Sequence, residues 1–449
     1  MTKGPCGAGL RLFRGLPPLA PAFKKTAGVW RESGSMDGVA QPRTKSLAPL
    51  GWIAVWGPGL LVMLADTDAG NVVTGAQAGA QWGYRLLPML LLLIPMLYMV
   101  QELTVRLGLH TGRGYGELIR ERFGAGWAWL SVAGLAAAVI GSLITEFTGV
   151  AGIGELYGLS RGVTLPLAAF ALLAVVATGS YRRVERAAIV VGLFELAFFA
   201  VAWAAHPSVE TLATDVADLP LGDHQFLFLA AAVIGATFNP WMIFYQQSAI
   251  ADKKLQLDHL TAARWDTAFG AALTQCLTGA VLVAAAATLG SGGAAVGLDS
   301  VGQISAALSP LLGENFGRLV FSAGVLGASL VAAIVCSLAL AWGVGEVTGY
   351  KHSLEYHPFK AKWFYGVYAA AVVGSAALVG FARDLVWLNI AAQVLNALLL
   401  PLVIGFLVAL ALTALPASLR PRGLYRWILI GVCAVVIAVG VYGGVAGLV

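Results

Sequence analysis

Eleven long apolar segments make up most of this chain, and each is bounded by charged or turn-forming residues. Segments of this length suit a lipid bilayer, where a backbone can satisfy its polar groups by forming a helix. Their expected limits are 50–82, 86–108, 127–156, 162–180, 187–205, 225–247, 267–290, 318–349, 362–382, 384–412 and 425–448. Only 11% of the residues are charged, against about 25% in soluble domains. The sequence therefore predicts an all-α polytopic membrane protein and disfavours a soluble enzyme.

The first 45 residues differ in composition from the rest of the chain. They are rich in Gly and Pro, contain eight Lys or Arg residues and lack a long apolar segment. We expect residues 1–45 to be a disordered cytoplasmic tail and residues 46–449 to form a single transmembrane domain. Translation can begin at Met1 or at Met36.

Basic residues are distributed unevenly between the two sides of the predicted membrane. With the N-terminus in the cytoplasm, 24 of the 28 Lys and Arg residues fall in cytoplasmic segments, and only Arg85, Arg161, Arg318 and Arg383 fall outside. This is the positive-inside pattern, and the odd number of segments places the C-terminus outside. We expect a multi-pass protein of the plasma membrane that functions as a monomer in the lipid bilayer, without nucleic-acid partners.

Polar residues interrupt the first apolar segment at residues 66–71 and the sixth at residues 235–241. A charged side chain in the hydrocarbon costs roughly 2.5–3.5 kcal/mol on insertion scales, so such a cluster indicates a broken helix that lines a polar cavity. A simple proline kink is the alternative for the sixth segment. The two interruptions match in a 5+5 inverted repeat, with repeat one over about 50–205, repeat two over about 225–412 and an extra helix at 425–448. Paired interruptions of this kind indicate the binding site of a transporter.

The two interruptions offer oxygen atoms that suit a hard cation. Asp68 supplies a carboxylate, and Asn71 and Asn239 supply amide oxygens. Pro240 has no N–H, so a carbonyl near Ala236 loses its helical donor and becomes available to a cation. Oxygen ligands without sulfur or imidazole are typical of a site for Mg²⁺, which usually keeps several of its waters.

Other polar residues in the segments are candidates for the site or for the route to it. Gln393 and Asn396 lie three residues apart and hence on one helix face, where hydrogen bonding between helices is the alternative role. Asp66 either lines a vestibule that attracts cations or is a hydrogen-bonded structural acid. Thr67 offers a backbone carbonyl, and Glu146 is a further acid that we expect along the route. The four cysteines and six histidines show no zinc or disulfide spacing, so no cofactor is expected.

Four stretches of the sequence resemble the Nramp family of divalent-metal transporters. The first span of that family, which carries an Asp-Pro-Gly-Asn motif, is similar to GPGLLVMLADTDAGNVVTGAQAGAQWGYRLL. The family's second span, the loop before its fifth span and its tenth span are similar to QELTVRLGLHTGRGYGELIRERFG, SYRRVERAA and AAQVLNALLLPLV. The resemblance covers most of residues 50–412 and implies a LeuT-type fold. It also implies that the metal ligands include Asp68, Asn71, the carbonyl of Ala236, and Gln393.

The chain departs from the family pattern at positions that govern metal choice and proton coupling. Asn239 stands where the family has a methionine, and Trp241 and Gln246 stand where it has histidines. From these positions we expect Trp241 and Gln246 to line a vestibule or the ion pathway. The aspartate and glutamate of the family's third span become Glu146 and Gly149. An amide in place of a thioether makes the site harder, and the loss of both histidines and the glutamate removes a proton route. This pattern resembles the Nramp-related magnesium transporter branch.

These features predict uncoupled Mg²⁺ uptake by alternating access, with Mn²⁺ as a second ion that the site could carry. The metal ion is then the substrate and not a cofactor. One alternative is a proton-coupled Mn²⁺ or Fe²⁺ carrier of the ordinary Nramp type, and a more distant one is a LeuT-fold carrier of an organic solute. A channel is disfavoured by the paired breaks. An intramembrane enzyme is disfavoured because the segments contain no GxSxG or HExxH motif.

Overall fold

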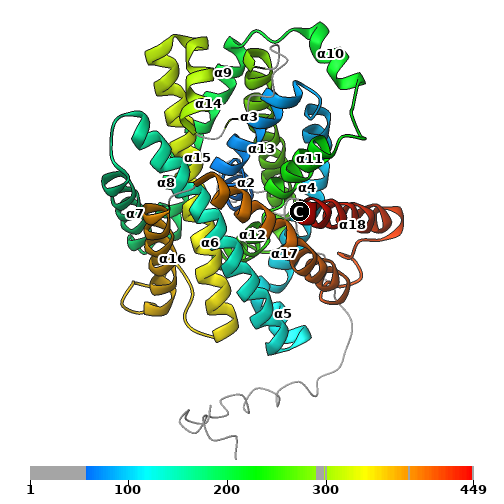
Figure 1. Cartoon of the computed structure of the whole chain (residues 1–449). Coiled ribbons are helices and arrows are strands. Elements are labelled where there is room, and N and C mark those ends of the chain that lie inside the picture. The colour runs from blue at the N-terminus through cyan, green and yellow to red at the C-terminus, as the bar shows by residue number, and fades with distance from the viewer. Residues whose placement is uncertain (1–56, 290–297, 299–300, 383–384, 447–449) are drawn as a thin grey trace, which may run out of the picture. The chain divides into compact units, whose positions relative to one another are not determined.

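The computed structural model describes residues 57–289, 298, 301–382 and 385–446 (Figure 1). The chain divides into two units, Met1–Ser46 and Leu47–Val449, and all of the described residues belong to the second. The tail predicted over residues 1–45 lies outside the described residues, and the predicted domain limits stay a prediction.

The described residues form helices and short 3₁₀ turns, and no strand occurs among them. In chain order the elements are α2 (Pro58–Leu64), α3 (Ala69–Trp82), α4 (Leu87–Thr111), α5 (Tyr115–Phe123), α6 (Ala125–Leu156), α7 (Arg161–Ala177), α8 (Tyr181–Gly192), η1 (Leu193–Leu196), α9 (Ala197–Ala204), α10 (Val209–Ala217), α11 (His224–Thr237), α12 (Pro240–Asp252), η2 (Leu257–His259), α13 (Leu260–Leu289), α14 (Val301–Leu308), η3 (Ser309–Leu312), α15 (Glu314–Thr348), α16 (Lys362–Phe381), α17 (Leu385–Thr413) and α18 (Gly423–Ala446).

Nine helical stretches of the described residues are long and apolar enough to cross a membrane. They are α4, α6, α8 with η1 and α9, α11 with α12, η2 with α13, α15, α16, the part of α17 from Leu395, and α18. The shorter α7 matches the fourth predicted segment, and α2 with α3 matches the described part of the first. Each of the eleven predicted segments therefore coincides with a helical element, which confirms the all-α polytopic prediction.

Both predicted helix breaks are present in the structure. The first falls between the end of α2 at Leu64 and the start of α3 at Ala69. The second falls between the end of α11 at Thr237 and the start of α12 at Pro240. Proline occupies the first position of α12, where its missing N–H removes no helical hydrogen bond, so it starts a new helix instead of kinking one.

Two other segments differ from each other in their continuity. The third predicted segment is one continuous helix, α6, of 32 residues. The fifth segment contains a 3₁₀ turn, η1, between α8 and α9. A stretch of 3₁₀ geometry within a helix often marks a functional position, and η1 contains the buried Glu195.

The broken helices pack among long continuous ones. Figure 1 shows α13 beside α3 and α4, and α13 also contacts α2; α17 contacts α6, α11 and α12. At Gly79 of α3, a Cβ atom would come within 2.2 Å of the carbonyl oxygen of Leu282 in α13, so only glycine allows this approach. Small residues at helix contacts are typical of membrane bundles.

A carboxylate from α13 holds the first turn of α2. Asp266 accepts hydrogen bonds from the backbone N–H groups of Gly59 at 2.7 Å, Leu60 at 3.1 Å and Gly57 at 3.2 Å. The first N–H groups of a helix have no partner within the helix, so Asp266 caps α2 from a distant part of the chain. This contact fixes where α2 begins.

Replacing Asp266 with alanine is expected to destabilise the protein by about 2 kcal/mol, because it leaves three N–H groups, two of them buried, without a charged acceptor. Thermal unfolding of the purified protein in detergent measures the change. Asp258→Ala, in the exposed η2 turn, is the matched control and should unfold as the wild type does. Equal unfolding of Asp266→Ala and the wild type would show that the cap contributes nothing.

Candidate functional site

The first break is organised by Asp68, which precedes α3. Its backbone is extended, and its Oδ1 accepts a hydrogen bond from the N–H of Asn71 at 2.7 Å. This is the geometry of a helix N-cap, in which the helix dipole stabilises the negative charge. Asp68 is only 2% exposed. The break therefore places a carboxylate inside the bundle.

Asn71 joins the first break to the second. Its Nδ2 donates to the carbonyl oxygen of Asp66 and, at 3.1 Å, to that of Ala236. Both carbonyls lie where a helix is interrupted, so they lack the full helical hydrogen bonding that would otherwise satisfy them. The amide uses its two N–H groups on these carbonyls, which leaves its Oδ1 for another partner.

Asn239 organises the second break in a similar way. Its Nδ2 donates to the carbonyl of Ala236 at 2.8 Å and lies 3.4 Å from Oδ1 of Asp66. Its Oδ1 accepts from Nδ2 of Asn396 in α17 at 3.0 Å. The structure therefore brings Asn71, Ala236 and Asn239 together, with Asp66 and Asn396 around them.

Asp66 and Thr67 are tied to α13. The hydroxyl of Thr274 lies 2.9 Å from the hydroxyl of Thr67 and 3.4 Å from Oδ2 of Asp66. Asp66 is fully buried. Of its two predicted roles, this environment favours the hydrogen-bonded acid over an open vestibule.

Glu146 and Trp241 lie close to the breaks but make contacts of their own. Glu146 in α6 accepts a hydrogen bond at Oε2 from the N–H of Ala69 at 3.2 Å, and its Oε1 has no partner among the described residues. The indole N–H of Trp241 donates to Ser142 of α6 at 3.1 Å. Ser142 also lies 3.5 Å from Nδ2 of Asn396. These contacts connect α6 to both broken helices.

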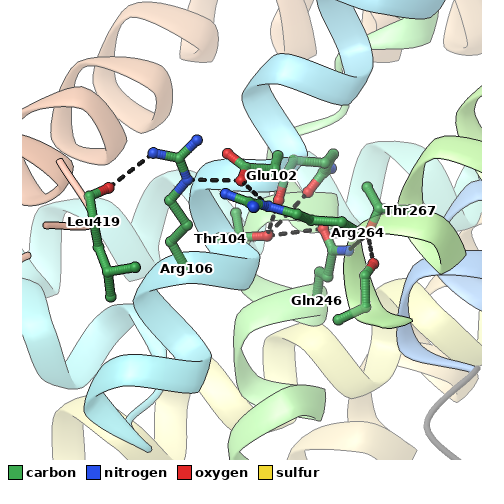
Figure 2. A network of polar contacts seen from close by, with 9 residues as sticks. Glu102, Thr104, Arg106, Gln246, Arg264, Thr267 and Leu419 are labelled. Carbon is green, nitrogen blue, oxygen red and sulfur yellow. Dashed lines mark hydrogen bonds and ion pairs between the residues drawn. The ribbon is translucent and has the colours of Figure 1, made fainter. Parts of the chain in front are cut away.

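The structure places Gln246 in a separate network. Its Oε1 accepts from Thr104 at 2.8 Å, and its Nε2 donates to Thr267 at 2.7 Å. Figure 2 shows this network beside Glu102, whose Oε1 receives an Nε–H from Arg106 and one from Arg264. Gln246 follows Asn239 by seven residues, about 10 Å along α12. None of its contacts reaches the two breaks.

Gln393 belongs to α17, and its side chain lies outside the described part of the structure. Its role as a ligand therefore stays a prediction. Among the described residues, no group of three or more His, Cys, Asp or Glu side chains is arranged to hold a metal ion. A cation bound at the breaks would therefore need amide and carbonyl oxygens and its own waters as ligands, in addition to a carboxylate.

Three residues that lie near the breaks were not predicted from the sequence to be part of the site. Ser142 and Thr274 are small hydroxyl residues in apolar helices, and no local pattern distinguishes them from ordinary packing residues. Glu195 was visible as an acid within an apolar segment, but its position along the fifth segment did not predict a place beside Thr67. The rotation of each helix decides these placements.

The eleven helical segments and the two paired breaks define a transporter of LeuT-type fold. The solved manganese transporter of Eremococcus coleocola matches with a TM-score of 0.73 and 17% identity, covering 89% of this chain and 88% of that one. MHP1, a nucleobase-cation-symport-1 family transporter, matches with a TM-score of 0.53 and 15% identity over 87% of this chain and 90% of that one. At these identities the likeness shows the fold alone.

Sequence comparison gives the family. The family model for natural resistance-associated macrophage protein-like proteins (Nramp) matches residues 59–446. The divalent metal cation transporter MntH of Yersinia pestis (strain Pestoides F) is 30% identical over 297 residues, which are 64% of this chain and 71% of that protein. MntH of Klebsiella pneumoniae (strain 342) is 28% identical over 305 residues, with 66% and 71% covered. The chain belongs to the Nramp family, whose members are transporters and not enzymes.

The separation of Gln246 from the breaks can be tested with Asn71→Leu and Gln246→Leu. Gln246→Leu should cost only about 1 kcal/mol of stability, because Thr104 and Thr267 keep hydrogen bonds to their own helices. It should keep any rise in unfolding temperature that a transported divalent cation produces by binding the folded state. Asn71→Leu should lose that rise. A loss of cation-dependent stabilisation in Gln246→Leu would contradict the separation.

Proposed function

We propose that this divalent metal cation transporter carries Mg²⁺ into the cell, without proton coupling, by alternating access. Asp68 supplies the charge, and the oxygens of Asn71, Asn239, Gln393 and the carbonyl of Ala236 complete the site. That carbonyl accepts hydrogen bonds from Nδ2 of Asn71 and of Asn239, so a cation that binds it would displace at least one of them. Mn²⁺ is a second ion that such a site admits. The metal is the substrate, and no cofactor takes part.

The observation that carries the proposal is Asn239. It occupies the position at which the Nramp pattern has a methionine. At the second break its amide donates a hydrogen bond to the carbonyl of Ala236 and accepts one from Asn396. An amide oxygen is a hard ligand that suits Mg²⁺, whereas a thioether is a soft ligand that selects transition metals. The hydrogen bonds described above join Asn239 to the break without any sulfur or imidazole.

The residues at the histidine positions support transport without protons. Trp241 is an indole that does not titrate, and its N–H is committed to Ser142. Gln246 does not titrate either, and it is committed to Thr104 and Thr267. Neither residue can pass a proton between the site and water, so the membrane potential becomes the driving force. For a divalent ion it supplies about 4.6 kcal/mol per 100 mV.

On this proposal the protein is a monomer in the plasma membrane, with its N-terminus in the cytoplasm and its C-terminus outside. The distribution of Lys and Arg residues supports that orientation. An inward-negative potential then draws cations toward the cytoplasm, which is the direction of uptake.

A proton-coupled Mn²⁺ carrier is the second candidate. Its support is Glu146, a fully buried carboxylate with one oxygen unpartnered among the described residues, close to the first break. The name of the similar Eremococcus coleocola protein, a manganese transporter, points the same way. Glu146 has no histidine partner at the second break, and this absence favours the uncoupled mechanism.

Transport by the full chain in proteoliposomes tests the function. With Mg²⁺ outside and a negative interior potential, we expect Mg²⁺ to enter without acidification of the lumen. Asp68→Asn should reduce the flux to the level of empty liposomes, because it removes the charge at the site and keeps the side-chain volume. Asp258→Asn, on the exposed η2 turn, should transport as the wild type does. Mn²⁺ entry with lumen acidification and without Mg²⁺ flux would overturn the proposal.

Asn239→Met tests the cause of ion choice. A thioether at this position should lower Mg²⁺ uptake and raise the ratio of Mn²⁺ or Cd²⁺ uptake to Mg²⁺ uptake by at least about tenfold, since soft ligands favour these ions. Metal-sensitive dyes inside the liposomes measure the ratio. Asn396→Leu, which removes the donor to Asn239 without adding sulfur, separates loss of packing from a change in ligand chemistry. An unchanged ratio in Asn239→Met would assign selectivity to other residues.

A further inference from the structure

Glu195 is a buried acid for which the proposed transport site gives no role. It lies in η1, between α8 and α9, and its exposed fraction is 0%. Neither of its carboxylate oxygens has a partner in good hydrogen-bond geometry among the described residues, and the hydroxyl of Thr67 is the donor that lies beside it. A buried carboxylate with so little hydrogen bonding is costly, so its presence calls for a compensating cation or proton.

The surroundings of Glu195 direct it at the first break. The polar side chain that it faces is Thr67, and the charges that it meets are those of Asp66 and Asp68. A Cβ atom on Gly192, one turn earlier, would contact both Leu64 of α2 and Oε1 of Glu195. The carboxylate therefore lies against the end of α2, on an element that supplies none of the residues of the proposed transport site.

The backbone of η1 is brought close to α15 by a second glycine. A Cβ atom on Gly327 would lie 2.7 Å from the carbonyl of Val191 and 3.6 Å from the backbone nitrogen of Glu195. Gly327 thus lets α15 pack against the backbone of η1, while the carboxylate of Glu195 lies on the side of the first break. The carboxylate is thus built into the bundle.

The first break is surrounded by acidic side chains. Four buried carboxylates surround the first break, namely Asp66, Asp68, Glu146 and Glu195. No Lys or Arg among the described residues forms an ion pair with any of them. When one divalent ion binds at Asp68, the carboxyl groups that it does not neutralise must each hold a proton or share a second cation.

We infer that Glu195 and the hydroxyl of Thr67 form a second cation subsite, beside the transport site and separate from it. Its ligand is a small hard cation that binds to oxygen, either Na⁺ or a second Mg²⁺, with waters completing its shell. The subsite does not depend on which divalent ion the transport site prefers. It would hold a cation against the hinge between α2 and α3 and thereby couple the state of that hinge to the ion.

Binding to the purified full-length protein in detergent tests the inference. Calorimetric titration with Mg²⁺ and equilibrium binding of radiolabelled Na⁺ are the two arms. If the second ion is Mg²⁺, the wild type binds two Mg²⁺ per chain, whereas Glu195→Gln and Asp68→Asn each bind one. If it is Na⁺, the wild type binds one Mg²⁺ and one Na⁺, and Glu195→Gln weakens Na⁺ binding by at least about tenfold while keeping Mg²⁺.

Matched variants separate the subsite from general damage. Thr67→Val should weaken binding of the second ion. Thr278→Val makes the same change at a different buried threonine, which lies on α13, and should leave that binding unchanged. Glu195→Asp should bind more tightly than Glu195→Gln because it keeps the charge. A wild type that binds one Mg²⁺ and no Na⁺, with Glu195→Gln identical to it, would overturn the subsite and assign Glu195 a proton. If Mg²⁺ fails to bind anywhere, the magnesium proposal fails, and the Na⁺ arm alone decides the subsite.

Discussion

The hydrogen bonds that Asn71 and Asn239 donate to the carbonyl of Ala236 are the interaction on which the rest of the site depends. Breaking two helices inside a bundle leaves backbone carbonyls without their helical donors, and each unsatisfied group would cost several kcal/mol in hydrocarbon. Two amides solve this problem with their N–H groups. Each amide also has an oxygen atom that can bind a cation. A carboxylate could bind the cation but could not donate to the carbonyl, and an apolar residue could do neither.

This constraint explains why the site could be predicted in part. Asp68, Asn71 and Asn239 were predictable because Pro240 and the carboxylates are incompatible with continuous membrane helices. For Asn396, hydrogen bonding between helices was the alternative to a ligand role, and its contact with Asn239 favours hydrogen bonding. A residue at a break can be recognised in the sequence because its charge, or its missing N–H, is unfavourable in a continuous membrane helix.

The residues that sequence reasoning missed have no such feature. Thr274 and Ser142 fit any apolar helix, and only the rotation of α13 and α6 turns their hydroxyls toward the breaks. Gln246 was assigned to the route from its position in the family pattern, yet seven residues of helix carry it into the network of Thr104 and Thr267. Position along a chain predicts which side chains are polar, and helix rotation decides which of them meet.

The contacts at the two ends of the first span suggest which end opens more easily. At the start of α2, Lys253 pairs with Glu185 at 2.8 Å, with side chains 13% and 10% exposed. Beyond the end of α3, Arg85 pairs with Asp215 at 3.2 Å, with side chains 27% and 14% exposed.

Solvent screens the second pair more strongly, and breaking a buried pair leaves charges that are costly to desolvate. The end near Asp215 should therefore separate at lower cost. On the proposed orientation that end faces outside, since the loop over residues 206–224 contains no Lys or Arg. The more exposed of the two ion pairs would then lie on the side from which the cation enters.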